Sequence, residues 1–117
     1  NDRNYVVFLR SIPIEGKPDM LRMQVYCDAS GAFLNVWVKD AAGQRWQFSF
    51  GPVTHTGWRR MEARLDTTLK WPVQLHEGSG KALTYPLTFE ALVLDYPTNE
   101  RAHGTIYTDQ LTAMATQ

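Results

Sequence analysis

The sequence has few residues that form disulfides or bind metals, with one cysteine and three histidines, and it has no net charge. Cys27 alone cannot form an internal disulfide, and no Cys/His cluster has the spacing of a zinc site. Twelve basic and twelve acidic residues balance, so no overall field draws the chain toward nucleic acid or an anionic membrane. We therefore expect no nucleic-acid partner.

Long hydrophobic runs are also missing. No window approaches the ~20 apolar residues of a membrane-spanning helix, and the first residues lack the regions of a signal peptide. We expect no membrane insertion. The 117 residues, 44% of them hydrophobic, are enough for one domain with its own core. Because Asn1 lies next to a predicted strand, we expect residues 1–117 to be a single domain excised from a larger multidomain protein.

Apolar residues recur mostly at period two, which predicts β-strands with one face in a core. The seven predicted strands are 5–9, 21–27, 34–38, 46–50, 57–65, 87–95 and 105–113. The fifth also fits a helical stripe through Trp58, Met61 and Leu65, but its alternation with charged residues favours a strand. Residues 66–86 are predicted to be a long irregular connection. Short strands with frequent turns predict an all-β fold, an antiparallel β-sandwich or jelly roll.

Two segments of the form Asp-Ala-x-Gly, at 28–31 and 40–43, are typical of tight turns in which glycine adopts a positive φ. We interpret them as consecutive hairpin loops. The middle of the chain is then a β-meander.

Strand parity predicts one sheet surface with aromatic side chains among amides and charges. If the aliphatic residues of 34–38 point inward, the residues between them point outward, and alternate residues of 21–27 and 57–65 do the same. An aromatic ring stacks on the apolar face of a sugar, while amides and arginine hydrogen-bond its hydroxyls. We therefore expect a carbohydrate-binding site formed by Trp37, Tyr26, Gln24, Asn35 and Arg60.

The same aromatic residues admit another interpretation. Trp37 and Tyr26 are then covered by the 66–86 segment or by a neighbouring domain, and the chain is a structural or protein-interaction module without a small ligand. Trp71 is predicted to pin the 66–86 segment to the sandwich. Trp46, which shares parity with Phe48 and Phe50, is predicted to lie in the core, as is Cys27.

No catalytic constellation is apparent. His55, His76 and His103 fall in separate predicted loops, without metal-binding spacing, and there is no Gly-x-Ser-x-Gly elbow. The Gly-Ser-Gly-Lys stretch at 78–81 lacks the full phosphate-loop pattern and is predicted to be a flexible loop. The sequence favours a domain that is not an enzyme.

Five short motifs follow one another in a recognisable order: Val-Tyr-Cys-Asp-Ala-Ser-Gly at 25–31, Lys-Asp-Ala-Ala-Gly-Gln at 39–44, Gly-Trp-Arg-Arg at 57–60, Tyr-Pro-Leu at 85–87 and Gly-Thr-Ile-Tyr-Thr-Asp-Gln-Leu at 104–111. This succession resembles the galactose-binding-like jelly-roll domains, more narrowly the carbohydrate-binding-module-like accessory domains of bacterial secreted or cell-surface proteins. The similarity covers about residues 17–113. Cys27 departs from an expected glycine, and Trp37 from a strand that is often more polar.

The resemblance implies two antiparallel sheets, an extracellular or cell-surface setting, and a non-catalytic role beside neighbouring domains of the same chain, with a glycan or polysaccharide as partner. It places Trp58, which follows a glycine at a strand entrance, in the core. Many members carry a structural calcium ion, and the resemblance makes Asp109 a ligand for it. The other ligands would come from Asp2, Glu15 and Asp19 in the first loop, an incomplete set. Alternatively, Asp109 hydrogen-bonds backbone amides.

Overall fold

The fold is an antiparallel β-sandwich. The computed structural model describes residues 4–28, 31–70, 72–80, 82–95 and 106–114, and within them it contains strands and no helix. The eight strands are β1 (Asn4–Ile14), β2 (Met20–Asp28), β3 (Phe33–Lys39), β4 (Arg45–Pro52), β5 (Thr56–Arg64), β6 (Gln74–Glu77), β7 (Leu87–Asp95) and β8 (Ile106–Met114). No helix in this part of the chain is long and apolar enough to cross a membrane. The all-β prediction is confirmed.

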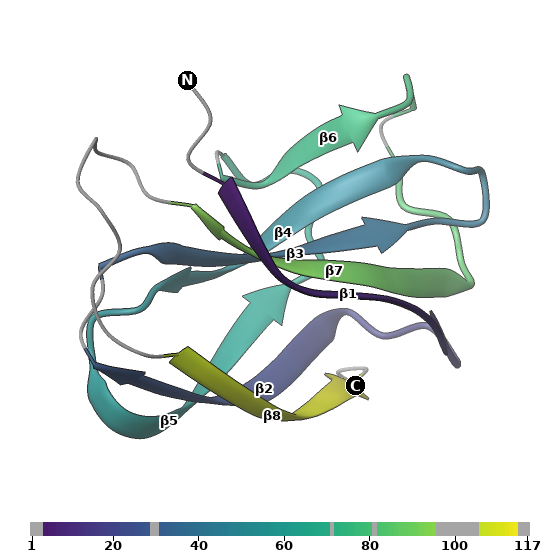
Figure 1. Ribbon diagram of the computed structural model, residues 1–117. Helices are drawn as coiled ribbons and strands as arrows, with labels where there is room; N and C mark the ends of the chain where they lie inside the picture. The colour runs from purple at the N-terminus through teal and green to yellow at the C-terminus, as the bar shows by residue number, and fades with distance from the viewer. Residues whose placement is uncertain (1–3, 29–30, 71, 81, 96–105, 115–117) are drawn as a thin grey trace.

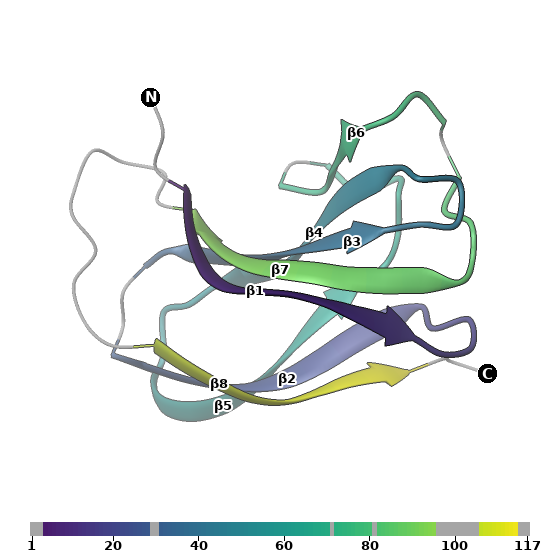
Figure 2. The same cartoon turned by 45° about the vertical axis from the view of Figure 1, so that its right-hand side comes forward.

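The strands form two layers (Figures 1 and 2). The first is a five-stranded sheet in the order β1-β7-β3-β4-β6, and the second a three-stranded sheet in the order β5-β2-β8. Every strand pair is antiparallel, which suits a sheet with one face on the core and the other exposed.

The predicted meander is wrong, because β2 and β3 do not pair. β2 lies between β5 and β8, whereas β3 lies between β4 and β7 in the other sheet. After 28–30 the chain runs beside Val53: Gly31 N donates to Val53 O at 2.9 Å, and Val53 N donates to Ala32 O at 2.7 Å. Only 40–43 closes a hairpin. Both segments contain residues that favour turns. Such residues do not determine whether the next strand pairs with the preceding one or crosses to the other sheet.

The predicted irregular connection over 66–86 contains β6, which the sequence analysis does not identify. β6 pairs with β4 at the edge of the five-stranded sheet, with Leu75 opposite Trp46 and Gln74 opposite Gln47. Only Leu75 of its four residues is partly buried. A strand of four mostly polar residues is too short to show the alternation of apolar and polar residues that identifies a strand in a sequence.

Inward parity is confirmed on β2, β3, β4 and β5, and the core fills the space between the two sheets. Its buried members come from β2 (Leu21, Met23, Val25, Cys27), β3 (Leu34, Val36, Val38), β4 (Trp46, Phe48, Phe50), β5 (Met61, Ala63) and β7 (Leu87, Phe89, Leu92, Leu94). Trp46 and Cys27 are buried as predicted.

The core prediction for Trp58 is wrong, since 57% of this residue is exposed. β5 points Met61 and Ala63 inward, so Trp58 and Arg60 belong to its outward parity. β5 is also an edge strand, so its neighbour β2 flanks it on one side only.

Truncating a core leucine should destabilise the fold far more than the same change outside the core. Leu21 is 1% exposed and Leu69 is 43% exposed. We expect Leu21→Ala to lower the free energy of unfolding by about 2–5 kcal/mol, through lost burial and the cavity left behind. Leu69→Ala should change it by less than about 0.5 kcal/mol. Urea denaturation of both variants checks this, and equal losses would contradict the assigned core.

Candidate functional site

The five residues expected to share one surface lie on two. Trp37 and Asn35 belong to β3 of the five-stranded sheet, whereas Gln24, Tyr26 and Arg60 belong to β2 and β5 of the three-stranded sheet. The outward faces of two stacked sheets point away from each other, so the single-surface prediction is wrong. Parity distinguishes inward from outward residues, but it does not say to which sheet a strand belongs.

Asn35 is not exposed as predicted. It is fully buried, and neither its amide nitrogen nor its amide oxygen has a hydrogen-bond partner in the described part of the chain. Its register neighbour Val93, on the same face of β7, is also fully buried. Asn35 therefore cannot contact a ligand in this conformation.

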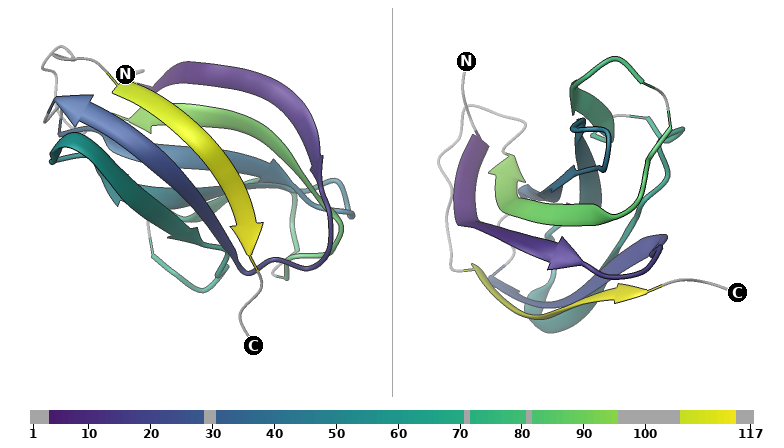
Figure 3. Two further views of the ribbon diagram at one scale, coloured as in Figure 1. Left: turned by 90° about the horizontal axis from the view of Figure 1, so that it is seen from below. Right: turned by 90° about the vertical axis from the view of Figure 1, so that its right-hand side faces the viewer.

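A cleft lies on the outer face of the five-stranded sheet. The sheet curves so that its two edge strands, β1 and β6, rise on the same side (Figure 3, right). The cleft has a volume of about 520 Å³ and takes side chains from all five strands of the sheet. Its lining residues are Leu9, Arg10 and Ser11 of β1, Trp37 of β3, Arg45 of β4, His76 and Glu77 of β6, and Glu90 of β7.

Trp37 forms the aromatic part of this cleft together with His76. The two rings stack with centroids 4.8 Å apart and planes at 24°. The indole Nε1 donates to Gln47 Oε1 at 2.9 Å, and Gln47 Nε2 donates to Pro72 O at 2.7 Å. Trp37 is therefore half-buried, partly under the 66–86 segment, and its ring orientation is fixed by a hydrogen bond.

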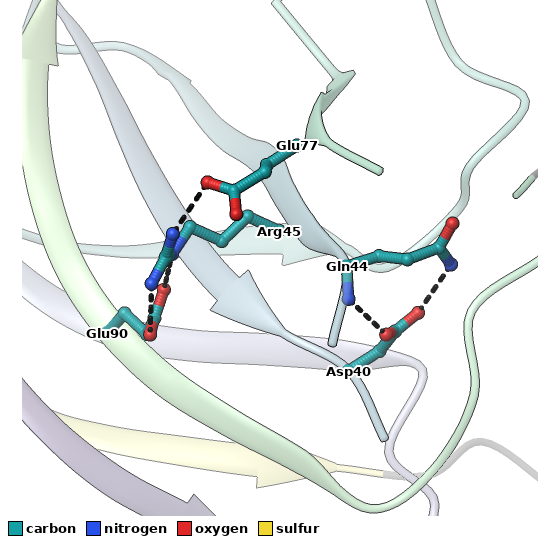
Figure 4. A network of polar contacts seen from close by, with 5 residues as sticks. All are labelled: Asp40, Gln44, Arg45, Glu77 and Glu90. Atoms are coloured by element: carbon teal, nitrogen blue, oxygen red, sulfur yellow. Dashed lines mark hydrogen bonds and ion pairs between the residues drawn. The ribbon is translucent and has the colours of Figure 1, made fainter. Parts of the chain in front are cut away.

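Arg45 gathers two carboxylates in the cleft (Figure 4). Its Nη1 lies 2.7 Å from Glu77 Oε2, and its Nε and Nη2 donate to the carboxylate of Glu90. Hydrogen bonding to Glu90 and the charge of Glu90, followed by Glu77, raise the pKa of Arg45. Arg45 therefore remains a cation, and it orients both carboxylates within the cleft.

Irregular pairing helps to direct these groups. Trp37 and Leu9 both lie opposite Ala91, and the next pairs skip to Phe89, so Glu90 is an extra residue in β7. On β1, Arg10 and Ser11 fall in the corresponding gap between Leu9 and Ile12. A β-bulge re-aims side chains, and here three cleft residues come from such irregularities.

A second polar network, centred on Asp40 and Gln44, connects the β3–β4 turn to Gly80, Ala82 and Thr84 (Figure 4). The buried carboxylate of Asp40 accepts hydrogen bonds from Ala42 N (3.0 Å) and Gln44 N (2.9 Å), which close the β3–β4 turn. It also accepts from Gln44 Nε2 (2.9 Å), Trp46 Nε1 (3.2 Å) and Thr84 N (3.4 Å). One charged group thus connects the turn, the core and the 66–86 segment.

Gln44 makes the matching contacts with the Gly-Ser-Gly stretch. Gly80 N donates to Gln44 Oε1, and Gln44 Nε2 donates to Ala82 O at 3.3 Å. Gly78 has φ +129°, and a Cβ placed there would lie 2.8 Å from Gln44 Cγ. This glycine is required for close approach, so the stretch is a packed contact at Gly78 and Gly80.

The three-stranded sheet carries the rest of the predicted site, joined by Trp58. Tyr26 lies opposite Trp58 and Gln24 opposite Arg60 in the β2–β5 register. The Tyr26 and Trp58 rings meet edge to face, with centroids 5.6 Å apart and planes at 62°. We call these four residues the outer platform; the three-stranded sheet that carries them is nearest the viewer in Figure 3, left.

The predicted calcium ligand Asp109 lies on β8 opposite Gln24, but its side chain is outside the described part, as is Trp71. Among the described residues, no group of three or more His, Cys, Asp or Glu side chains is placed to hold a metal ion. The calcium site stays a prediction.

Sequence reasoning missed most of the cleft. Outward parity places Arg45 on the same sheet face as Trp37, but nothing in the sequence marks Leu9, His76, Glu77 or Glu90. Bulges and an unrecognised edge strand position them, and their partners are distant in the chain. His76 and Glu77 become visible only when β6 is recognised as a strand.

Comparison with protein-family models, with curated proteins and with solved structures finds no match for this chain.

The Asp40 network should make stability depend on acid pH. Burial raises the pKa of Asp40, but hydrogen bonds from the Gln44 side chain and backbone, Trp46 and Thr84 outweigh it and leave the pKa below 3.8. A lowered pKa stabilises the fold above about pH 4, and this contribution is lost as pH falls through the folded pKa. Asp40→Asn should cost about 2–3 kcal/mol at pH 7, because it removes charge-assisted hydrogen bonds.

Urea denaturation at pH 7 and at about pH 2–3 tests this. The difference in the free energy of unfolding between the wild type and Asp40→Asn should become smaller at acid pH. Glu62→Gln, which breaks an exposed ion pair with Arg22, is the control and should cost less than about 1 kcal/mol at pH 7. A gap that stays constant from pH 7 into acid would contradict the role of the Asp40 charge.

Proposed function

We propose that this chain is a non-catalytic carbohydrate-binding accessory domain whose glycan occupies the cleft of the five-stranded sheet. One observation carries the proposal: two aromatic rings and a charged, hydrogen-bonding triad converge on one concave surface. Sugar recognition needs this combination of apolar and directional polar groups. The motif resemblance to galactose-binding-like jelly rolls supports the same assignment.

Different residues of the cleft would contact different parts of a pyranose. The Trp37–His76 pair and Leu9, which is 74% exposed, provide apolar contact for ring C–H groups. Glu77 and Glu90 accept hydrogen bonds from hydroxyls, and Ser11 both donates and accepts. Positive and negative charges balance in the cleft, with Arg10 and Arg45 against Glu77 and Glu90. A neutral glycan is therefore the ligand class that fits.

The cleft is also preorganised. Gln47 holds the Trp37 indole, and two carboxylates hold the Arg45 guanidinium, so little side-chain freedom remains to be lost when a ligand binds. Both carboxylates are engaged by one arginine, an arrangement that suits recognition more than acid-base chemistry.

The setting of the domain belongs to the same proposal. An extracellular or cell-surface location, neighbouring domains in one chain and a structural calcium ion rest on the motif resemblance alone.

A second candidate is a structural or protein-interaction module with no small ligand. The internal contacts of Trp37 favour it, since the ring is stacked by His76 and its N–H is satisfied by Gln47. In that account Trp37 fastens β6 to the sheet, and no glycan binds.

Titrating the purified domain with neutral gluco-, galacto- and manno-oligosaccharides, with and without calcium, distinguishes the two accounts. We expect a saturable change in tryptophan fluorescence. Trp37→Ala should weaken binding by roughly tenfold or more, because a ring contact contributes about 1.5 kcal/mol. Trp37→Phe, which keeps a ring, should lose less affinity than Trp37→Ala.

Trp58→Ala is the matched control, because it removes a tryptophan from the opposite outer face and should leave binding in the cleft intact. Circular dichroism must show that the Trp37 variants are folded. If none of the neutral oligosaccharides changes the tryptophan fluorescence, and Trp37→Ala lowers the melting temperature, the cleft is rejected as a sugar site. That result would favour the structural module.

A further inference from the structure

We propose that the outer platform of the three-stranded sheet is a second binding site, specific for an acidic sugar such as a uronate unit of a polysaccharide. Trp58 and Tyr26 would contact the sugar ring, Arg60 its carboxylate and Gln24 a hydroxyl. The platform and the cleft lie on opposite outer faces, so each site is tested independently of the other.

The platform is an ordered arrangement on two adjacent strands. Tyr26 and Gln24 are two residues apart on β2, and Trp58 and Arg60 face them on β5. The edge-to-face contact with Tyr26 holds Trp58 in place while 57% of the tryptophan stays exposed. An ordered, exposed indole presents apolar surface to a ligand at little entropic cost.

The polar side chains of the platform, Arg60 and Gln24, are available to hydrogen-bond a ligand. Within the described residues, neither the Arg60 side chain nor the Gln24 side chain forms a hydrogen bond or an ion pair. Their strand neighbours differ: Arg22 pairs with Glu62 at 2.7 Å, and Arg64 lies close enough to act electrostatically on Asp66. Of the described arginines on this face, Arg60 is the one without a counter-charge.

The charge pattern selects an acidic ligand. A guanidinium binds a carboxylate through two parallel hydrogen bonds, a stronger contact than it makes with a neutral hydroxyl. Trp58 and Arg60 are two residues apart on one strand, about 7 Å along its axis. A sugar ring against Trp58 thus places its own carboxylate within reach of Arg60. The cleft lacks this cationic bias, because Glu77 and Glu90 balance Arg10 and Arg45 there.

Isothermal titration with a galacturonate oligomer, and with a galactose oligomer of the same length, tests the proposal. We expect the acidic oligomer to bind the wild-type domain more tightly than the neutral one at this face, and more weakly as salt is added. Arg60→Gln and Trp58→Ala should each reduce its association constant by about tenfold or more.

Arg59→Gln is the matched control. Arg59 is also exposed and adjacent, but it lies opposite the buried Val25 and therefore has the other parity. The variant removes the same charge without touching the platform and should retain binding, as should Trp37→Ala. Thermal unfolding of each variant confirms that it is folded.

Four results would overturn the proposal. No binding of the acidic oligomer would exclude the site. An equal loss in Arg59→Gln would show diffuse charge attraction. A loss in Trp37→Ala but not in Trp58→Ala would place the ligand in the cleft. Self-association abolished by Trp58→Ala, with no oligomer binding, would show that the platform contacts a second copy of the chain. Failure of the cleft proposal would be recognised separately, from the titration with neutral oligosaccharides.

Discussion

The buried carboxylate of Asp40 is the interaction on which the cleft depends. It closes the β3–β4 turn, receives the indole N–H of Trp46 from the core and binds the backbone of Thr84. From the same hairpin, Gln44 binds Gly80 and Ala82, Arg45 binds Glu77, and Gln47 binds Pro72. These contacts attach the 66–86 segment along β4. Since β6 forms one wall of the cleft, the polar residues of this hairpin create the concave surface.

The two outer faces of the sandwich differ in charge and in shape. In the cleft, the Arg45 guanidinium is bonded to both Glu77 and Glu90, and Trp37 is held by His76 and Gln47. On the outer platform, Trp58 is exposed and Arg60 has no counter-charge among the described residues. Saturated groups in a concave site favour neutral ligands that match fixed positions. The two proposals therefore assign an anionic ligand to the open platform and a neutral ligand to the cleft.

The sequence predicts the fold class because alternation along single strands is a local property. The inward residues of β2 to β5, including Cys27 and Trp46, are buried as the period requires. Trp58 follows the same rule on β5, and its core assignment came from the motif resemblance rather than from parity. The partition of β2 and β3 between sheets was missed, because turn residues do not encode strand partners. The cleft was missed because β6 is short and polar and Glu90 enters through a bulge.

The most direct test of the cleft as a glycan site is a ¹H–¹⁵N NMR titration that follows the tryptophan indole N–H signals as a neutral oligosaccharide is added. The Trp37 indole, which borders the cleft, should shift progressively and saturate. The Trp46 indole, which is buried against Asp40, should stay fixed and serve as an internal reference. Saturating shifts confined to Trp58, or none at Trp37 while the oligosaccharide binds, would contradict a glycan site in the cleft.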